Sequence, residues 1–330
     1  MIKNHANISV FVPHLGCPNM CSFCNQHYIA RTTLLPDAGT VKTAVEIAVN
    51  SKNYVAENTE IAFFGGSFTA IDREYMLYLL ETAYTYVKNG TVKGIRISTR
   101  PDCISKEILE ILKSYGVTAI ELGAQSMCDD VLVLNKRGHS SKNVITAAEQ
   151  IKQYGFELGL QMMTGLYGDS YEKSIITVQK IIELKPDTVR IYPTIVLANT
   201  LLAELYKKGQ YTPQTLDDAV KLCSECLDMF RSNGIRVIRT GLHTIDESKY
   251  VAGPWHPAFK ELCDSAFYLK KAKESLKEKG NYEISVNPKE LSKMIGQKKQ
   301  NLNSLLALGY NCKVVPDENI DKYKLIIKRM

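Results

Sequence analysis

Three cysteines within residues 17–24 are the part of this sequence best suited to chemistry. They are Cys17, Cys21 and Cys24, and the other six of the nine cysteines are scattered along the chain. A tight trio without a secretory signal predicts a metal site rather than a disulfide framework. Three thiolates can hold three irons of a 4Fe–4S cluster and leave the fourth iron open to a small molecule. The alternative is a zinc site with His14 or His27 as its fourth ligand.

A pair of glycines forms a second motif, Phe63-Phe64-Gly65-Gly66-Ser67-Phe68-Thr69, at the end of an apolar run. Paired glycines let the backbone approach a ligand closely because no Cβ stands in the way. Alone, Gly65 and Gly66 would be typical of an ordinary turn. One predicted strand after the cysteine trio, they indicate a second part of the same binding site, with Ser67 beside them.

The elements that position these motifs repeat in the order helix, Gly or Pro, and short apolar run. Strands alternating with helices of this length predict parallel pairing through right-handed crossovers, and hence an α/β fold with a full or partial TIM-type barrel. Ligands bind at the carboxyl ends of the strands in such barrels, where both motifs would lie. The strands are predicted at 8–12, 60–64, 94–98, 117–122, 156–163, 188–192 and 235–239, and the helices at about 40–53, 72–88, 105–115, 141–154, 170–185 and 215–233.

The last part of the chain departs from this rhythm. A lysine-rich helix is predicted at about 258–279, followed by a strand, a helix-turn-helix and two strands. We therefore predict two domains, 1–279 and a small α+β domain at 280–330. Residues 1–259 carry 26 basic and 26 acidic residues, so the net charge of +6 comes entirely from residues 260–330, which carry 15 and 9. A basic tail favours an anionic partner, although a solvated lysine-rich surface would give the same composition.

The cysteine segment Cys17-Pro18-Asn19-Met20-Cys21-Ser22-Phe23-Cys24 resembles the signature of the radical S-adenosylmethionine superfamily. That signature has this spacing, with an aromatic residue before the last cysteine. The resemblance implies a 4Fe–4S cluster on the three cysteines and S-adenosylmethionine on its open iron. The cluster would split this cofactor into methionine and a 5′-deoxyadenosyl radical that abstracts a substrate hydrogen. It also implies that Phe23 packs near the adenine and that the strand end at Gly65, Gly66 and Ser67 accepts the cofactor's ammonium group. The second motif thus disfavours zinc.

Further segments resemble, in matching order over about residues 7–245, the catalytic subunit of the elongator complex, a tRNA-modifying radical enzyme. They are Ser98-Thr99-Arg100-Pro101-Asp102, Glu121-Leu122-Gly123-Ala124-Gln125-Ser126, Asn135-Lys136-Arg137-Gly138-His139 and Ile191-Tyr192-Pro193-Thr194. That subunit has an acetyltransferase domain after its radical domain. The 330 residues leave no room for one, so we do not expect its acetyl-group chemistry on wobble uridine to carry over.

Oxygen-independent coproporphyrinogen oxidase shares this layout more loosely, and the wider group implies further cofactor contacts. Gln125, Arg137 and Gln161 match positions that contact the ribose or the carboxylate of S-adenosylmethionine. An arginine fork suits a carboxylate, and an amide at a strand end can hold ribose hydroxyls. Ser98 lies where the oxidase has a carboxylate. The alternatives are satisfied polar residues at the barrel rim for the two glutamines, and a surface salt bridge for Arg137.

The C-terminal segment Met294-Ile295-Gly296-Gln297-Lys298-Lys299 resembles the I-G-x-x-G helix–loop–helix of KH domains, whose loop clamps a nucleic-acid backbone. The second glycine of that motif is Lys299 here. Gly296, Lys298 and Lys299 are therefore candidate RNA contacts, with the two lysines meeting phosphates electrostatically. The alternative is a structural appendage that braces the barrel, in which Gly296 simply ends a helix.

Two other pairs have structural interpretations. Glu121 and Arg190 lie within predicted strands and could form an ion pair. Cys223 and Cys226 could be a second metal pair, but they share an apolar helical stripe, which favours core packing.

Together these patterns predict a radical S-adenosylmethionine enzyme that acts on RNA, most plausibly tRNA, and receives electrons from a donor such as flavodoxin or ferredoxin. The rivals are a radical enzyme acting on a small metabolite and a non-catalytic metal-binding module. No apolar run reaches the roughly 18–20 residues that a membrane helix needs. The amino terminus has no signal-peptide pattern, so we expect a cytoplasmic protein without membrane contact.

Overall fold

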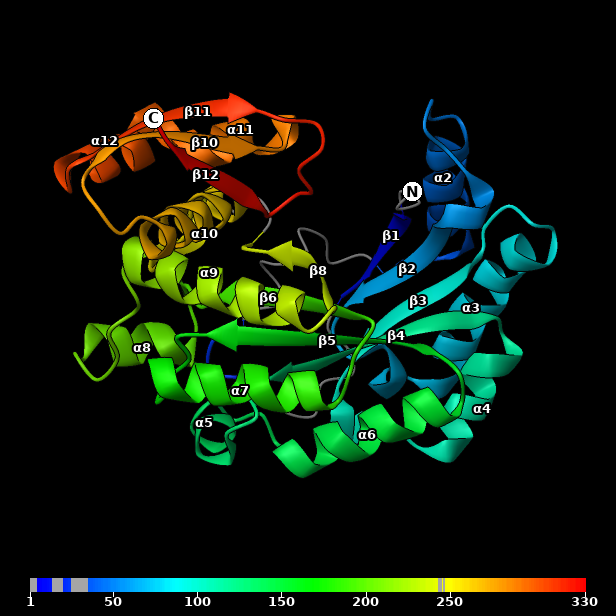
Figure 1. Ribbon diagram of the computed structural model, residues 1–330. Coiled ribbons are helices and arrows are strands. Elements are labelled where there is room, and N and C mark those ends of the chain that lie inside the picture. The colour runs from blue at the N-terminus through cyan, green and yellow to red at the C-terminus, as the bar shows by residue number, and fades with distance from the viewer. Residues whose placement is uncertain (1–4, 14–19, 25–34, 243–244, 246) are drawn as a thin grey trace.

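Seven parallel strands form one sheet in the order β1-β2-β3-β4-β5-β6-β8. The computed structural model describes residues 5–13, 20–24, 35–242, 245 and 247–330. The sheet curls into a half-barrel (Figure 1), which confirms the predicted partial barrel. The strands are β1 (Ala6–Val12), β2 (Thr59–Gly65), β3 (Gly94–Thr99), β4 (Val117–Gln125), β5 (Glu157–Thr164), β6 (Thr188–Pro193) and β8 (Arg236–Thr240).

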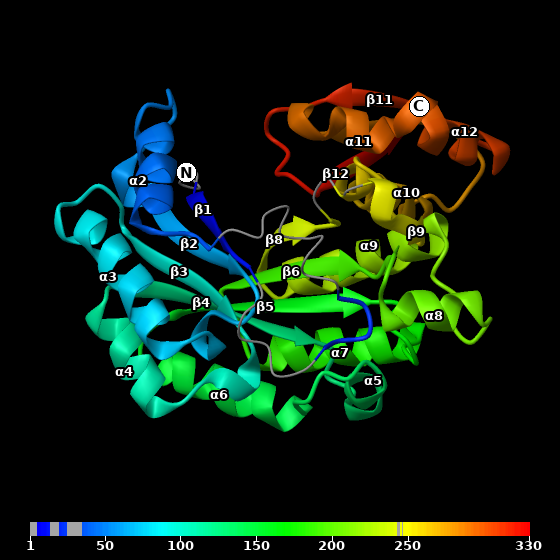
Figure 2. The ribbon, with the colours of Figure 1, turned by 180° about the vertical axis from the view of Figure 1, so that it is seen from behind.

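Six helices link these strands and cover the outer face of the sheet (Figure 2). They are α2 (Ala38–Val49), α3 (Arg73–Lys88), α4 (Lys106–Ser114), α6 (Ser141–Gln153), α7 (Tyr171–Glu183) and α9 (Leu216–Ser232). Local chemistry defines their ends. Each helix begins behind a Ser, Thr or Asp whose side chain accepts a backbone amide of the first turn. Glycines with φ between 70° and 81° follow α4, α6 and α9, at Gly116, Gly155 and Gly234.

The main core lies between the sheet and these helices. Cys223 and Cys226 are fully buried in it, so core packing is confirmed for this pair. Burial raises the pKa of the Cys223 thiol to about 12, which keeps it protonated.

Short elements near the strand ends escaped prediction because they span too few residues to show a period. They are α5 (Asp129–Leu134), α8 (Leu201–Lys207) and the antiparallel pair β7 (Val196–Leu197) and β9 (Tyr250–Ala252). Among the described helices, none combines the length and apolar character needed to cross a membrane.

The C-terminal region forms a second sheet in the order β11-β10-β12, with its own hydrophobic core. Strand β10 pairs parallel with β11 and antiparallel with β12. The predicted order of strand, helix-turn-helix, strand and strand is confirmed, while the domain boundary near residue 279 stays a prediction. The elements are α10 (Phe259–Ser275), β10 (Gly280–Val286), α11 (Leu291–Ile295), α12 (Gln300–Ala307), β11 (Tyr310–Pro316) and β12 (Leu325–Arg329).

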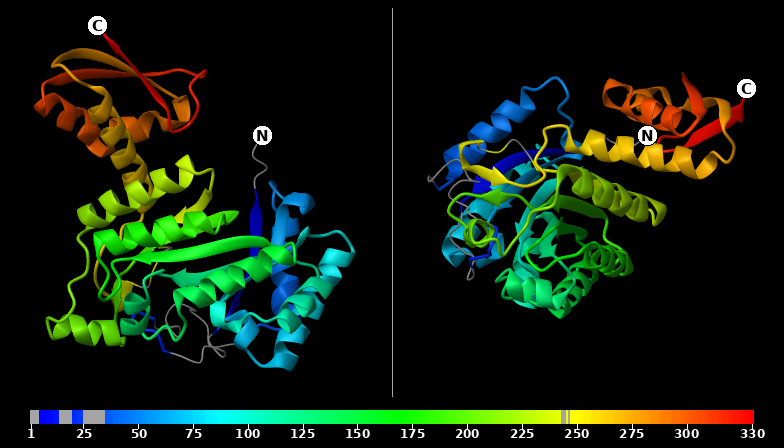
Figure 3. Two further views of the ribbon diagram at one scale, coloured as in Figure 1. Left: turned by 60° about the horizontal axis from the view of Figure 1, so that its bottom comes forward. Right: turned by 90° about the vertical axis from the view of Figure 1, so that its left-hand side faces the viewer.

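Helix α10 joins the two parts (Figure 3). Its first half packs Phe259 into the main core, and its second half packs Phe267 and Tyr268 into the C-terminal core. Between them, the fully buried Asp264 forms ion pairs with three cations. These are Arg231 of α9 at 2.7 Å, Lys260 of α10 at 2.7 Å and Lys293 of α11 at 3.1 Å. The C-terminal unit is therefore fixed to the half-barrel by charge as well as by apolar contact.

Candidate active site

The described part of the cysteine segment, residues 20–24, follows β1 and lies against the carboxyl end of β4, as predicted. Cys21 is buried and Cys24 is half-buried. The amide of Cys24 donates to the carbonyl of Cys21 at 3.1 Å, which makes a turn between them. Cys17, His14 and His27 lie outside the described residues, so the complete ligand set stays a prediction.

A buried arginine holds Cys21 against the sheet. Arg137 Nη1 donates to Cys21 Sγ at 3.0 Å, and Nη2 donates to the carbonyl of Gly123 in β4 at 2.7 Å. Arg137 is thus a buried residue at the cluster loop, which excludes the surface salt bridge considered above.

Ser22 and Phe23 connect the cysteine segment to residues at α5 and α8, two short helices that the sequence did not predict. Ser22 Oγ donates to Asn135 Oδ1 at 2.6 Å, and the Ser22 carbonyl accepts the amide of Leu202 in α8 at 2.8 Å. Phe23 packs against a small cluster that includes Leu202 and Tyr211. Whether one face of this ring meets an adenine stays a prediction.

The glycine motif brings the end of β2 against the end of β1. Gly65 has φ +131°, and a Cβ there would lie 2.1 Å from the carbonyl oxygen of Val12. The amide of Gly66 donates to that same oxygen at 3.4 Å. Only glycine fits at position 65, and the reason is close backbone approach between β1 and β2.

Ser67 and Ser98 lie beside the glycine pair. Ser67 is fully buried, and its hydroxyl lies 2.8 Å from Thr99 Oγ1 and accepts the amide of Arg100 at 3.2 Å. It therefore ties the end of β2 to the end of β3. Ser98 lines the same narrow space as Gly66 and Ser67.

The two predicted glutamines come together across β4 and β5. Gln161 Nε2 donates to Gln125 Oε1 at 3.3 Å. Gln125 is buried and has a left-handed backbone, with φ 64°, next to a β-bulge. A non-glycine residue in this conformation costs about 1–3 kcal/mol, and such strain clusters at ligand sites.

Sequence reasoning missed three residues that surround this site, although all lie in the segments that carry the family resemblance. Arg100 makes two parallel bonds to Asp102, at 2.9 and 2.8 Å, and also donates to the carbonyl of Arg137. Burial, with the nearby charge of Arg137, lowers the pKa of His139 to about 4, so its ring is neutral at pH 7. Among the described residues, Arg100 Nη1 and Arg137 Nε are buried without a hydrogen-bond partner.

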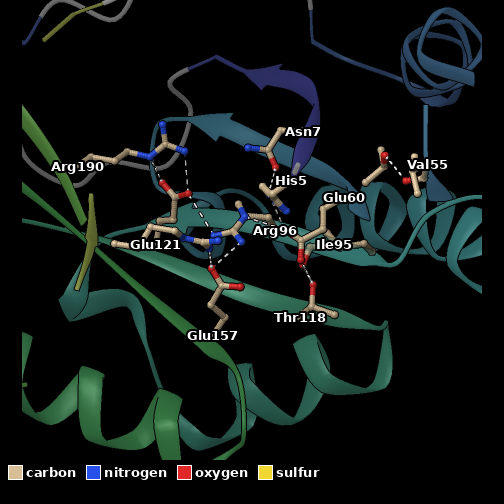
Figure 4. A network of polar contacts seen from close by, with 12 residues as sticks. His5, Asn7, Val55, Glu60, Ile95, Arg96, Thr118, Glu121, Glu157 and Arg190 are labelled. Atoms are coloured by element: carbon tan, nitrogen blue, oxygen red, sulfur yellow. Dashed lines mark hydrogen bonds and ion pairs between the residues drawn. The ribbon is translucent and has the colours of Figure 1, made fainter. Parts of the chain in front are cut away.

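A network of buried charges fills the inside of the half-barrel (Figure 4). Arg96 is 1% exposed and contacts three carboxylates, those of Glu60 at 2.8 Å, Glu157 at 2.9 Å and Glu121 at 3.4 Å. Glu121 also accepts two bonds from Arg190, at 2.7 and 2.9 Å, which confirms the predicted ion pair. Each charge of this network has an opposite charge beside it within the protein, so we assign the network a structural role and no part in the chemistry.

Two protein-family models match the sequence of this chain. Residues 11–181 match the Radical SAM superfamily, and residues 186–268 match the Radical_SAM C-terminal domain. The chain therefore belongs to the radical SAM superfamily. It is a radical S-adenosylmethionine enzyme, and the cofactors of this family are a 4Fe–4S cluster and S-adenosylmethionine.

Two individual proteins show which members of the superfamily this chain resembles. The tRNA uridine(34) acetyltransferase of Dehalococcoides mccartyi is 27% identical over 240 residues, which cover 62% of this chain and 52% of that protein. Elongator complex protein 3 of Homo sapiens is 31% identical over 191 residues, which cover 52% of this chain and 35% of that protein. The chain thus matches about half of the first of these two relatives and about a third of the second.

Among solved structures, the archaeal Methanocaldococcus infernus Elp3 with an N-terminal deletion superposes with a TM-score of 0.64. It is 22% identical and the match covers 84% of this chain and 65% of that one, which supports the fold.

The described residues fit the two cofactors. Cys21 is buried, and its sulfur accepts a hydrogen bond from Arg137, so the side chain is held in one position, as a metal ligand should be. The unpartnered N–H groups of Arg100 and Arg137 suit an anionic group such as a carboxylate. When bound, the cluster supplies the electron that splits S-adenosylmethionine.

Proposed function

We propose that this radical enzyme modifies RNA, and most plausibly tRNA. The observation that carries the proposal is the match of the half-barrel to relatives named tRNA uridine(34) acetyltransferase and Elongator complex protein 3. Their acetyl-transfer chemistry is not part of the proposal, because the match covers only 52% and 35% of the lengths of these two proteins.

Within this proposal, the cofactor is held at the strand ends. Cys17, Cys21 and Cys24 hold the cluster, and the backbone at Gly65 and Gly66 receives the ammonium group of S-adenosylmethionine. Gln125 and Gln161 hold its ribose, Arg137 faces its carboxylate, and Phe23 lies at its adenine. Ser67 and Ser98, which line the same narrow space as Gly66, complete the proposed cofactor site. The strained backbone of Gln125 supports a ligand at this position.

The C-terminal unit would bind the RNA backbone. The turn between α11 and α12 has φ 77° at Gly296, 49° at Lys298 and 61° at Lys299. It projects two exposed lysines at the start of α12, where backbone amides also favour phosphate. Flavodoxin or ferredoxin would supply the electron. In the competing hypothesis, the C-terminal unit is a structural brace for the half-barrel. The three ion pairs of Asp264 favour this role. A small metabolite would then be the better substrate.

Nucleoside mass spectrometry tests the proposal directly. Total tRNA from a strain lacking the gene is compared with tRNA from its parent and from the deletion strain complemented with wild type or Cys21→Ala. We expect one modified nucleoside to vanish in the deletion strain and to return only with the wild-type gene. Identical nucleoside profiles in all four strains would contradict an RNA substrate.

A further inference from the structure

One row of residues crosses four strands at the level of the cofactor site. Strand register pairs Gly123 with Gln161, Gln161 with Arg190 and Arg190 with Arg239. Residues paired in this way on parallel strands point to the same face of the sheet. Arg190 points inside the half-barrel toward Glu121 (Figure 4), so Arg239 of β8 lies on the inner face beside it.

The cations of this inner face differ in how their charge is balanced. Arg96 contacts three carboxylates, Arg190 has Glu121, and Arg236 lies 3.6 Å from Glu157. Arg239 has no carboxylate within 4.0 Å among the residues that the structure describes, and its Nε donates instead to the carbonyl of Gly241 at 3.3 Å.

The surroundings make this charge costly. Arg239 is half-buried and stands next to the positive charge of Arg190. Burial lowers the pKa of Arg239, and Arg190 acts in the same direction, whereas Tyr192 acts in the opposite one. Burial also raises the pKa of Tyr192, so this neighbouring phenol is neutral and does not compensate the charge. A half-buried guanidinium with no carboxylate partner among the described residues keeps its N–H groups available for an anionic ligand.

We infer that Arg239 binds an anionic group of the substrate inside the half-barrel. This inference rests on the proposed function, under which the anion is a phosphate of the RNA chain. Arg239 lies two strand spacings, about 10 Å, from Gln161 at the proposed cofactor. A nucleotide whose base or sugar reaches the cofactor would thus place its phosphate near the guanidinium, which suits phosphate oxygens.

Arg239→Ala tests the role in substrate binding, with Arg236→Ala as the matched control on the same strand. Binding of tRNA is measured at several salt concentrations with the cluster and S-adenosylmethionine present. For Arg239→Ala we expect about tenfold weaker binding and a log–log salt slope smaller by about 0.7 to 0.9. The control should bind tRNA like wild type. Equal loss of S-adenosylmethionine affinity in Arg239→Ala would make Arg239 a cofactor contact and overturn the inference.

A second measurement needs no RNA. Phenylglyoxal modifies accessible guanidinium groups, and peptide mass spectrometry reports the rate at each arginine of the reconstituted protein. Inorganic phosphate, compared with chloride at equal ionic strength, should slow modification of Arg239 several-fold and leave Arg236 unchanged. Protection of Arg239 without any tRNA binding by wild type would support the anion site while refuting the RNA proposal. No protection, together with unchanged tRNA binding in Arg239→Ala, would refute the anion site itself.

Discussion

Arg137 shows how much a single side chain can decide at this site. The guanidinium donates to Cys21 Sγ and to the carbonyl of Gly123, so it fixes Cys21, a proposed cluster ligand, to the edge of β4. The segment Asn135–His139 therefore holds the cluster loop in position.

The first prediction concerns the cluster. Cys21→Ala should lose most of the iron after anaerobic reconstitution, because two thiolates hold a 4Fe–4S cluster poorly. Reductive cleavage of S-adenosylmethionine should disappear with it. Cys312→Ala, which removes a half-buried cysteine of the C-terminal sheet, is the control and should keep full iron content. Iron and sulfide per chain are measured, and wild-type values in Cys21→Ala would refute the ligand assignment.

The second prediction is a pH dependence due to His139. Its pKa is about 4 in the folded protein and about 6.5 when unfolded. Below pH 6.5 the unfolded state binds the proton more readily, so stability is full above pH 6.5 and falls progressively toward pH 4. Between pH 7.5 and 5.5 this residue should cost about 1 kcal/mol of unfolding free energy. His139→Gln should remove that part of the dependence in urea titrations, and parallel pH profiles for both proteins would contradict it.

The candidate active site lies at the carboxyl ends of the strands rather than along their whole length. The carboxyl ends of β1, β2, β4 and β5 place the cysteine segment, the glycine pair and the two glutamines at one edge. Close approach is possible there because Gly65 has no side chain, and the bulge in β4 turns Gln125 into a left-handed conformation.

The third prediction tests the approach of β2 to β1. Gly65→Ala should lower the unfolding free energy by more than about 2 kcal/mol, because the new Cβ meets the Val12 carbonyl as well as an unfavourable φ. Gly90→Ala is the control, since φ is +75° there but no atom lies within 4 Å of the new Cβ. It should cost about 1 kcal/mol. Equal losses of stability in urea titrations would show that the close approach to β1 is unimportant.

On the scale of the whole molecule, α10 and Asp264 couple the C-terminal unit to the half-barrel. Deleting residues 280–330 would uncover Phe267 and Tyr268, so a deletion would confuse weaker RNA binding with lower stability. Point variants in the turn between α11 and α12 avoid this problem.

The fourth prediction concerns that turn. Lys298→Gly with Lys299→Gly removes two charges while keeping the left-handed backbone, which glycine adopts readily. Binding of tRNA should weaken, and the log–log salt slope should fall by about 0.7 to 0.9 for each phosphate that a lysine no longer neutralises. Lys52→Ala with Lys142→Ala changes the net charge equally at exposed sites on the barrel domain. If both double variants bind tRNA alike, the C-terminal unit is a structural brace.

The sequence was sufficient for the framework of this protein. All seven barrel strands and the order of the C-terminal elements could be predicted, because their signals are local: apolar runs bounded by glycine and proline, and helices that begin at Ser, Thr or Asp. The cysteine spacing likewise indicated the chemistry of the family. These features depend on residues close together in the chain.

Only the tertiary structure decided which distant side chains meet. The hydrogen bond from Arg137 to Cys21 joins residues 116 positions apart, and α8 holds the cysteine loop although its seven residues show no clear period. The row from Gly123 to Arg239 depends on strand register, including a shift between Val189 and Arg190 that no local pattern reveals. Register sets which side chains share the inner face, because a slip of one residue reverses the face of every side chain on that strand.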